Sequence, residues 1–228
     1  MSMVVPASVA AARPVILDNV THAVVENGRH RQVLAPLSHA FAAGALHVVG
    51  GPAGSGKAAL LSILSLAVRP SRGAVLWGDV DLSALHPAQQ TKWRRRNLGL
   101  VLDSASLVGV MTVRDHVRMA AAIRRRQDAE AEGLAILGAL GMGAQLNLLP
   151  AQLSGGEKEC VVLAQALCAR PAILLAEEPT SALDHAKAAL VAYTLRNFAR
   201  DANAVVICVS HDPLVMDAAD DVLILEKV

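Results

Sequence analysis

Residues 51–58 read Gly51-Pro52-Ala53-Gly54-Ser55-Gly56-Lys57-Ala58. This run matches the phosphate-binding pattern G-x-x-x-x-G-K-[ST] at every position except the last, where Ala58 replaces a hydroxyl residue. Glycine permits backbone conformations in which several N–H groups converge on phosphate oxygens, and Lys57 adds a compact cation for the outer phosphates. The stretch therefore predicts a nucleotide-binding loop that lacks one ordinary ligand for Mg²⁺.

The sequence on either side of this loop supports the interpretation. Residues 45–49 form a short apolar run, as expected of the strand that precedes such a loop, and residues 60–64 carry the apolar face of a helix. A helix beginning near Lys57 directs its partial positive charge at the phosphates. A chance glycine turn is the alternative, but it does not account for the flanking strand and helix.

The composition is that of one globular α/β domain. The chain has 228 residues, a formal net charge of +1 and a hydrophobic fraction of 54%. The near-zero charge and an aromatic fraction of 2% argue against nucleic acid as a partner. Arginine triplets at residues 94–96 and 124–126 are expected to be solvated helix faces. Contact with a partner protein or with anionic lipid headgroups is the alternative for these triplets.

Cysteine use and hydropathy favour a reducing, cytoplasmic setting. Cys160, Cys168 and Cys208 lie in apolar patterns and are expected to be buried thiols rather than a disulfide framework. Polar residues and Pro150 interrupt the longest uncharged run, and the apolar N-terminus has no basic start. No membrane span and no signal peptide are therefore expected.

Continuous apolar runs predict a parallel sheet. Residues 172–176 and 204–209 suit strands buried on both faces, and a helix expected at 186–200 completes a βαβ unit. Other strands are expected at residues 15–17, 24–25, 74–77, 98–102 and 222–225, and helical patterns cover residues 113–149 and 154–169. The earliest strands indicate an N-terminal β-rich piece.

Charged residues follow two of these strands. Glu177 and Glu178 come directly after residues 172–176, and His211 follows residues 204–209. Because the carboxyl ends of parallel strands meet at one edge of a sheet, these side chains are expected beside the phosphate loop. One carboxylate can serve a metal and the other a water. A lone histidine after a strand is usually structural, but this combination favours a catalytic role.

The string Leu153-Ser154-Gly155-Gly156-Glu157 is the most discriminating part of the sequence. Taken alone, it is a helix N-terminus whose hydroxyl and N–H groups suit an anion. Taken with the phosphate loop, the carboxylate pair and His211, it shows that the chain resembles the nucleotide-binding domain of an ABC transporter over essentially its whole length. The local sequence at residues 78–82 and 179–184 is similar to that of one branch of this family, which serves lipoprotein release, macrolide export and FtsE-like complexes.

The resemblance implies a fold and a set of partners. The fold is an α/β P-loop NTPase core, with a mostly parallel sheet flanked by helices, an N-terminal antiparallel β subdomain and a helical subdomain. Residues 1–228 would form a single ABC ATPase domain that contains the helical subdomain at residues 104–165. Such domains act peripherally at the cytoplasmic face of the membrane, paired with a second ABC ATPase subunit. They drive a separate membrane permease, which would dock near residues 108–116.

The resemblance also implies roles for individual residues. Those expected to bind ATP are Gly51, Pro52, Ala53, Gly54, Ser55, Gly56, Lys57, Ala58 and Ala59, and those expected to cap the ATP of a second subunit are Ser154, Gly155 and Gly156. Glu178 would be the general base or water-orienting acid, and His211 would contact the γ-phosphate. Residues 181–184 would form a loop that crosses between subunits.

Several positions depart from the family pattern. Ala58 lacks the hydroxyl that binds Mg²⁺, Glu177 stands where aspartate is usual, and Asp103 stands where glutamine is usual. Glu177 and Asp103 remain as candidate metal ligands. Val24 stands where the family usually has an aromatic residue that stacks on adenine, and Cys160 stands where arginine is common. Weakened metal binding and a lower affinity for nucleotide are therefore expected.

Two functional hypotheses follow. In the first, the chain is a transport ATPase subunit that couples ATP binding and slow hydrolysis to the permease. In the second, it is a degenerate regulatory or structural subunit whose LSGG string completes the site of a competent partner. Glu178 and His211 favour the first, whereas Ala58, Glu177 and Asp103 favour the second. Impaired hydrolysis at the chain's own site is expected on balance.

Overall fold

The computed structural model describes residues 13–26, 28–102, 107–124, 126 and 128–228. The helices and strands follow in the order β1 (Val15–Glu26), β2 (Arg29–Phe41), β3 (Ala45–Gly50), α1 (Lys57–Leu64), β4 (Arg72–Trp77), β5 (Val80–Asp81), α2 (Pro87–Asn97), β6 (Leu98–Val101), α3 (Val113–Arg124), α4 (Ala129–Ala139), η2 (Gly143–Gln145), η3 (Pro150–Gln152), α5 (Gly155–Cys168), β7 (Ile173–Glu177), α6 (His185–Asp201), β8 (Val205–Val209), α7 (Pro213–Ala218) and β9 (Asp221–Ile224). The two η elements are single 3₁₀ turns.

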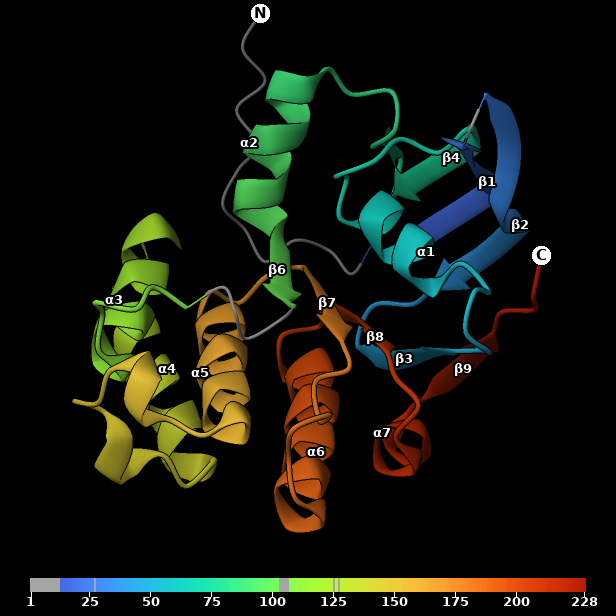
Figure 1. Cartoon of the computed structure of the whole chain (residues 1–228). Coiled ribbons are helices and arrows are strands. Elements are labelled where there is room, and N and C mark those ends of the chain that lie inside the picture. Colours follow the sequence, from blue (N-terminus) through green and yellow to red (C-terminus); the bar gives the residue numbers. More distant parts are fainter. Residues whose placement is uncertain (1–12, 27, 103–106, 125, 127) are drawn as a thin grey trace, which may run out of the picture.

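The strands form two sheets (Figure 1). One has the order β6-β7-β8-β3-β9 and is parallel at every pairing, and the other has the order β2-β1-β4-β5 and is antiparallel. The predicted combination of a parallel sheet flanked by helices with an N-terminal antiparallel sheet is confirmed. The two strands expected at residues 15–17 and 24–25 are parts of one strand, β1, whose pairing with β2 shifts register on the way.

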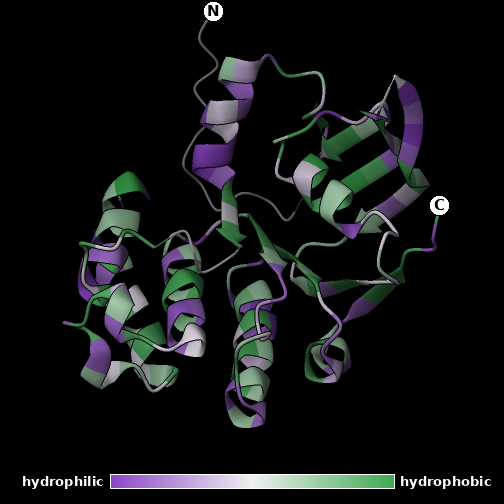
Figure 2. Cartoon of the chain, viewed as in Figure 1, coloured by the Kyte–Doolittle hydropathy of each residue, from purple (hydrophilic) through white to green (hydrophobic). Residues whose placement is uncertain are grey.

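The parallel sheet separates two hydrophobic layers. Successive residues of a strand point to opposite faces. Leu174 and Val206 therefore pack with α5 and α6 on one face, whereas Leu175 and Ile207 pack with α1 and the antiparallel sheet on the other. Cover on both faces explains why residues 173–176 of β7 and the whole of β8 are unbroken apolar runs. Figure 2 shows the hydrophobic colouring of these strands.

The helices α3, α4 and α5 pack against one another beside the sheet (Figure 1). A Cβ on Gly133 would lie 2.4 Å from the Val117 side chain and 3.1 Å from Cys168, so the missing side chain lets the helices approach closely. The helical prediction for residues 113–149 is correct in α3 and α4 and wrong beyond α4, where the chain makes turns. Gly141, with a φ of 75°, takes the left-handed conformation that ends this run.

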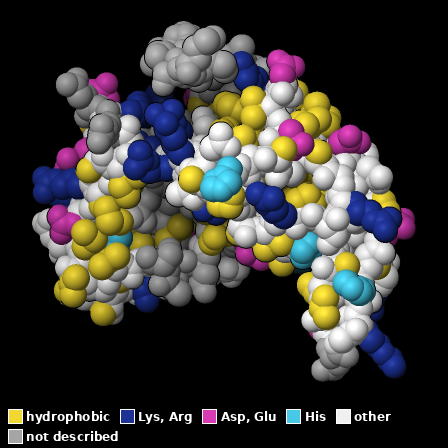
Figure 3. All heavy atoms as spheres, turned by 90° about the horizontal axis from the view of Figure 1, so that it is seen from above, with side chains coloured by type: hydrophobic (Ala, Val, Ile, Leu, Met, Phe, Trp, Pro, Cys, Tyr) yellow, Lys and Arg dark blue, Asp and Glu magenta, His cyan; other side chains and the backbone are white. Residues whose placement is uncertain are grey.

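The two arginine triplets have different environments. Arg95 and Arg96 are exposed on α2, as expected of a solvated face, and Lys and Arg side chains gather on the surface seen from the α2 side (Figure 3). Arg124 and Arg126 are only half-exposed, and they donate hydrogen bonds to the carbonyls of Leu98 and Cys168. The expectation of a solvated face is therefore wrong for these two residues.

The three cysteines are free and buried, as predicted. Burial disfavours the charged thiolate, and it raises the pKa of Cys168 to about 11 and that of Cys208 to about 12. Burial also raises the pKa of Cys160. Within the described ranges, no helix is both long enough and apolar enough to cross a bilayer.

The thiols of the folded chain should not react with thiol reagents at pH 8. A raised pKa keeps each thiol protonated at this pH, and burial blocks access as well. We expect no fast reaction of the native chain with Ellman's reagent and release of three equivalents after unfolding in guanidinium chloride. A thiol that reacts within seconds in the native state would contradict this prediction.

Candidate functional site

The phosphate loop joins β3 to α1, as the sequence predicts. Gly56 has a φ of 95° and immediately precedes Lys57, the first residue of α1. A Cβ on Gly56 would lie 2.4 Å from the carbonyl oxygen of Val33, and one on Gly51 would lie 2.4 Å from that of Leu225. The loop is therefore enclosed by backbone from β2 and from the end of β9, and these two positions require glycine.

The side chains of the loop suit an anionic ligand. Lys57 Nζ donates hydrogen bonds to the carbonyls of Gly51 and Pro52, at 2.6 and 3.0 Å, which folds the ammonium group back over the loop. Ser55 is 1% exposed, and its Oγ has no hydrogen-bond partner among the described residues. A buried hydroxyl without a partner is unfavourable, and a phosphate oxygen in the loop would satisfy it.

The metal side of the loop is poorer in oxygen ligands. Ala58 is exposed in the first turn of α1 and has no side-chain oxygen, and the same is true of Ala59, which is half-exposed. Glu177 lies exposed at the end of β7, where the sequence places it. Asp103, the other candidate ligand, falls outside the described residues. Carboxylates are suitable ligands for Mg²⁺, so the residues present fit this ion through acids and not through a helix hydroxyl.

Glu178 and His211 meet at the carboxyl ends of β7 and β8. The Glu178 N–H donates to the Val209 carbonyl at 2.8 Å, and the residue has a φ of 42°, a conformation uncommon outside glycine. Its Oε2 accepts from Ser210 Oγ at 3.3 Å and from the His211 N–H at 3.4 Å, and His211 Nε2 lies 3.9 Å from Oε1. The adjacent strand ends thus bring the acid and the histidine together, as expected.

A cleft of 290 Å³ opens beside these carboxylates. It is lined by Val101, Leu102, Glu159, Glu177, Glu178, Pro179 and Ser181. Three of these residues are acids from α5 and from the end of β7. Such a lining suits a hydrated cation and a polarised water, and it repels a free anion.

Two residues that sequence reasoning missed hold the loop after β7. Glu159 of α5 accepts hydrogen bonds from Ser181 Oγ at 2.9 Å and from the Ala182 N–H at 3.2 Å. Thr180 Oγ1 donates to Asp212 Oδ2 at 2.7 Å, and Asp212 caps α7. These contacts join segments far apart in the sequence, so no local pattern announces them.

The LSGG string begins α5 with a capping box. Ser154 Oγ accepts from the Glu157 N–H at 3.3 Å, and Glu157 Oε2 accepts from the Ser154 N–H at 2.8 Å. The bonds from Ser154 lower the pKa of Glu157. Gly155 is exposed, whereas a Cβ on Gly156 would lie 2.8 Å from the Ala182 carbonyl. The string therefore packs on residues 181–184 and presents an exposed helix N-terminus.

The structure does not bring this N-terminus to the phosphate loop of the same chain. α5 packs on one face of the parallel sheet, and α1 packs on the other (Figure 1).

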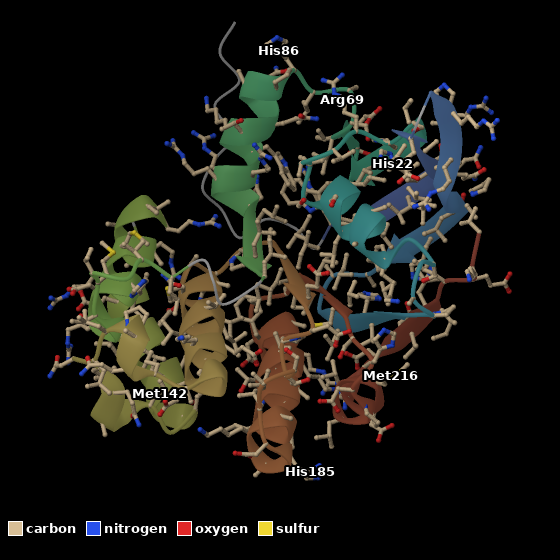
Figure 4. All side chains as sticks on the ribbon, viewed as in Figure 1. His22, Arg69, His86, Met142, His185 and Met216 are labelled. Atoms are coloured by element: carbon tan, nitrogen blue, oxygen red, sulfur yellow. The ribbon has the colours of Figure 1, made fainter. Side chains whose placement is uncertain are left out.

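In the antiparallel sheet, His22 lies on β1 (Figure 4), and its Nδ1 is buried without a partner among the described residues. Val24, on the same strand, is half-exposed and pairs with Arg31 of β2.

Comparisons with known proteins agree with this geometry. Residues 34–181 match the family model described as ABC transporter. The chain is 36% identical over 198 residues to the lipoprotein-releasing system ATP-binding protein LolD of Bordetella pertussis, covering 86% of each chain. It is 33% identical over 198 residues to the LolD protein of Shewanella oneidensis, again with 86% of each covered.

Solved structures show the same fold. The dimeric structure of MJ0796, a bacterial ABC transporter cassette, has a TM-score of 0.86 and 26% identity, and the match covers 93% of this chain and 94% of that one. A post-hydrolysis state of MJ0796 bound to ADP and Pi has a TM-score of 0.84 and 26% identity, with 93% and 96% covered. The chain belongs to the ABC transporter family.

Proposed function

We propose that this chain is the nucleotide-binding subunit of an ABC transporter and couples ATP binding to a separate membrane permease. The observation that carries this proposal is the meeting of three features on adjacent strand ends. These are the phosphate loop after β3, Glu178 after β7 and His211 after β8. The similarity to LolD supports the transporter role, because those relatives are ATP-binding proteins of a lipoprotein-releasing system. Residues 1–228 would act as one cassette, with residues 104–165 as its helical part.

Different residues would bind the phosphates of ATP and assist its hydrolysis. Backbone N–H groups of the loop, Ser55 and Lys57 would hold the phosphates, which agrees with the unsatisfied Ser55 hydroxyl. Glu178 would accept a proton from the attacking water or orient it, and His211 would contact the γ-phosphate. Mg²⁺, when bound, supplies charge to offset the developing negative charge on the phosphates.

A second cassette would complete the site. Ser154, Gly155 and Gly156 present an exposed helix N-terminus away from the phosphate loop of their own chain, and an anion bound by a second subunit fits there. The MJ0796 cassettes are dimeric, which supports this arrangement. Glu159 would hold residues 181–184 in position for the same contact.

The permease would dock on the surface around residues 108–116, at the cytoplasmic face of the membrane. Val110 is 87% exposed there. A separate groove of 620 Å³, at the C-terminal end of α3, is lined by Arg95, Arg96, Ala122, Ile123 and Arg124. An exposed apolar side chain such as Val110 is the kind of surface that protein partners cover.

Hydrolysis at the chain's own loop would be slow, because Ala58 leaves Mg²⁺ one ligand short. The degenerate hypothesis, in which the chain serves only a partner's site, predicts no turnover at all. Turnover of the purified chain with Mg-ATP therefore distinguishes slow hydrolysis from the degenerate hypothesis.

Replacing Lys57 with alanine should weaken ATP binding by about 10–100-fold, because a hydrogen bond to a charged group contributes about 1.5–3 kcal/mol. Fluorescence titration with a labelled ATP analogue measures the affinity. Lys92→Ala, at an exposed position on α2, is the matched control and should bind as the parent does. Unchanged affinity in Lys57→Ala would rule out the phosphate-loop role.

Replacing Ala58 with serine should raise Mg-ATP turnover on the order of tenfold, because the hydroxyl restores one charge-assisted contact. Phosphate release measured across a MgCl₂ series should also show half-saturation at a lower metal concentration. Ala67→Ser places the same group at an exposed position beyond the end of α1 and should have no such effect. Equal responses of the two variants would show that Ala58 does not limit the metal site.

Replacing Glu178 with glutamine should lower turnover by about 10²–10⁴-fold, the range of a general base, while ATP affinity stays the same. Single-turnover phosphate release and equilibrium binding separate the two effects. Robust turnover of the unaltered chain that is lost in Glu178→Gln would contradict the degenerate hypothesis. Turnover that survives the substitution would instead remove Glu178 from the mechanism.

A further inference from the structure

Two histidines and an aspartate form a cluster away from the phosphate loop. His39 lies near the end of β2, His47 on β3 and Asp221 at the start of β9, directly opposite His47 in the parallel register. One ligating atom from each residue lies within 4.8 Å of the other two. The fold thus gathers imidazole and carboxylate groups, which bind late first-row transition metals, from three separate strands.

Both rings point at one carboxylate oxygen. Asp221 Oδ2 lies 3.0 Å from His39 Nε2 and 3.1 Å from His47 Nδ1. A tetrahedral zinc ion with bonds of about 2.1 Å separates neighbouring ligand atoms by about 3.4 Å. Both separations from Asp221 Oδ2 are close to this value, and the two histidine nitrogens lie within 4.8 Å of each other, so side-chain rotations would admit an ion.

The hydrogen bond made by the second ring nitrogen of His47 fixes the tautomer of the ring. Nε2 lies 3.0 Å from the Ala42 carbonyl oxygen, which can only accept, so Nε2 carries the proton. In the neutral ring, Nδ1 then presents a lone pair to Asp221 Oδ2, and two acceptors face each other. Either a second proton on the ring, which makes an ion pair with Asp221, or a metal ion between the two atoms removes this repulsion. Histidine ligands of metals ordinarily donate their other N–H to a carbonyl or a carboxylate, as His47 does.

Burial holds the histidines and leaves the aspartate accessible. The side chain of His47 is 4% exposed, that of His39 is 22% exposed and that of Asp221 is 42% exposed. The ring of Phe41 makes edge contacts with both histidine rings, at centroid distances of 4.6 and 5.3 Å. Two packed ligands and one open side give the ion an entry path and leave a position for water.

The neighbouring acid is already engaged. Asp220 accepts from the Leu46 N–H at 3.0 Å and pairs with Arg196 and Arg200 at 3.1 and 3.0 Å. It therefore serves the packing of α6 against the sheet and does not compete with Asp221 for an ion.

We propose that His39, His47 and Asp221 bind one divalent late transition-metal ion, zinc fitting best, with water as the fourth ligand. Two imidazoles and one carboxylate suit zinc, whereas Mg²⁺ and Ca²⁺ take oxygen ligands. The ion joins the end of β2 to β3 and β9. Its binding needs neither nucleotide nor a second subunit, so it stands or falls separately from the proposed ATP site.

The test is a titration of the untagged, nucleotide-free chain with ZnCl₂, followed by calorimetry and thermal unfolding. We expect one equivalent to bind and the Tm to rise. Asp221→Asn and His39→Ala should each weaken binding by at least about 100-fold, since even loss of an outer hydrogen-bond partner weakens a site 10–100-fold. His185→Ala removes an exposed histidine at the start of α6 (Figure 4) and should bind zinc as the parent does.

Cobalt reports the geometry of the same site. CoCl₂ should give the visible absorption of a four-coordinate ion in the parent chain and in His185→Ala, and none in Asp221→Asn. Circular dichroism checks the fold of each variant, and His39→Gln replaces Asp221→Asn where the latter does not fold. Absence of saturable zinc binding by the parent, or binding that persists unchanged in the ligand variants, overturns the proposal. MgCl₂ should bind no more weakly to Asp221→Asn than to the parent, and a loss of Mg²⁺ binding would also contradict it.

Discussion

The parallel register of β3, β7 and β8 is the constraint on which the candidate site depends. Val49 of β3 and Glu177 of β7 both pair with Val209 of β8, so the three strands end at the same level. The phosphate loop, the carboxylates and His211 then emerge side by side at one edge. Burial on both faces maintains this alignment, because a one-residue slip would turn every apolar side chain to the wrong layer.

Sequence reasoning succeeded where burial is continuous and failed where it is not. β8 is wholly apolar and β7 is apolar up to its last residue, Glu177, and their positions follow from that pattern alone. A helix face was expected at residues 94–96, but the extent of α2 escaped prediction because its one buried residue is Gln90, and the helix begins through local caps, Pro87 and the His86–Gln89 box. The roles of Glu159 and Thr180 were out of reach for another reason: their partners, Ser181 and Asp212, meet them through tertiary packing.

In the structure, Ala58 affects the metal side of the phosphate loop and leaves the other groups of the loop unchanged. The parts of the loop that would hold phosphate under the proposed function are in place: Gly56 initiates α1, Lys57 lies over the loop, and the Ser55 hydroxyl is buried without a partner among the described residues. Under the same proposal, Ala58 removes one oxygen on the metal side, where acids from β7 line the cleft. Affinity for the phosphates and competence in metal-assisted chemistry would then be separate properties of this loop.

β9 runs beside β3 from the histidine cluster to the phosphate loop. Asp221 begins β9 in the histidine cluster, and Leu225, just beyond its end, donates to the Gly50 carbonyl at 2.9 Å. The Leu225 carbonyl in turn occupies the space that a side chain on Gly51 would need. An ion that fixed the start of β9 against His47 would thus restrain the backbone that encloses the phosphate loop. Among the described strands β9 pairs with β3 alone, so such a restraint would act at an edge of the sheet, where a strand has one neighbour and not two.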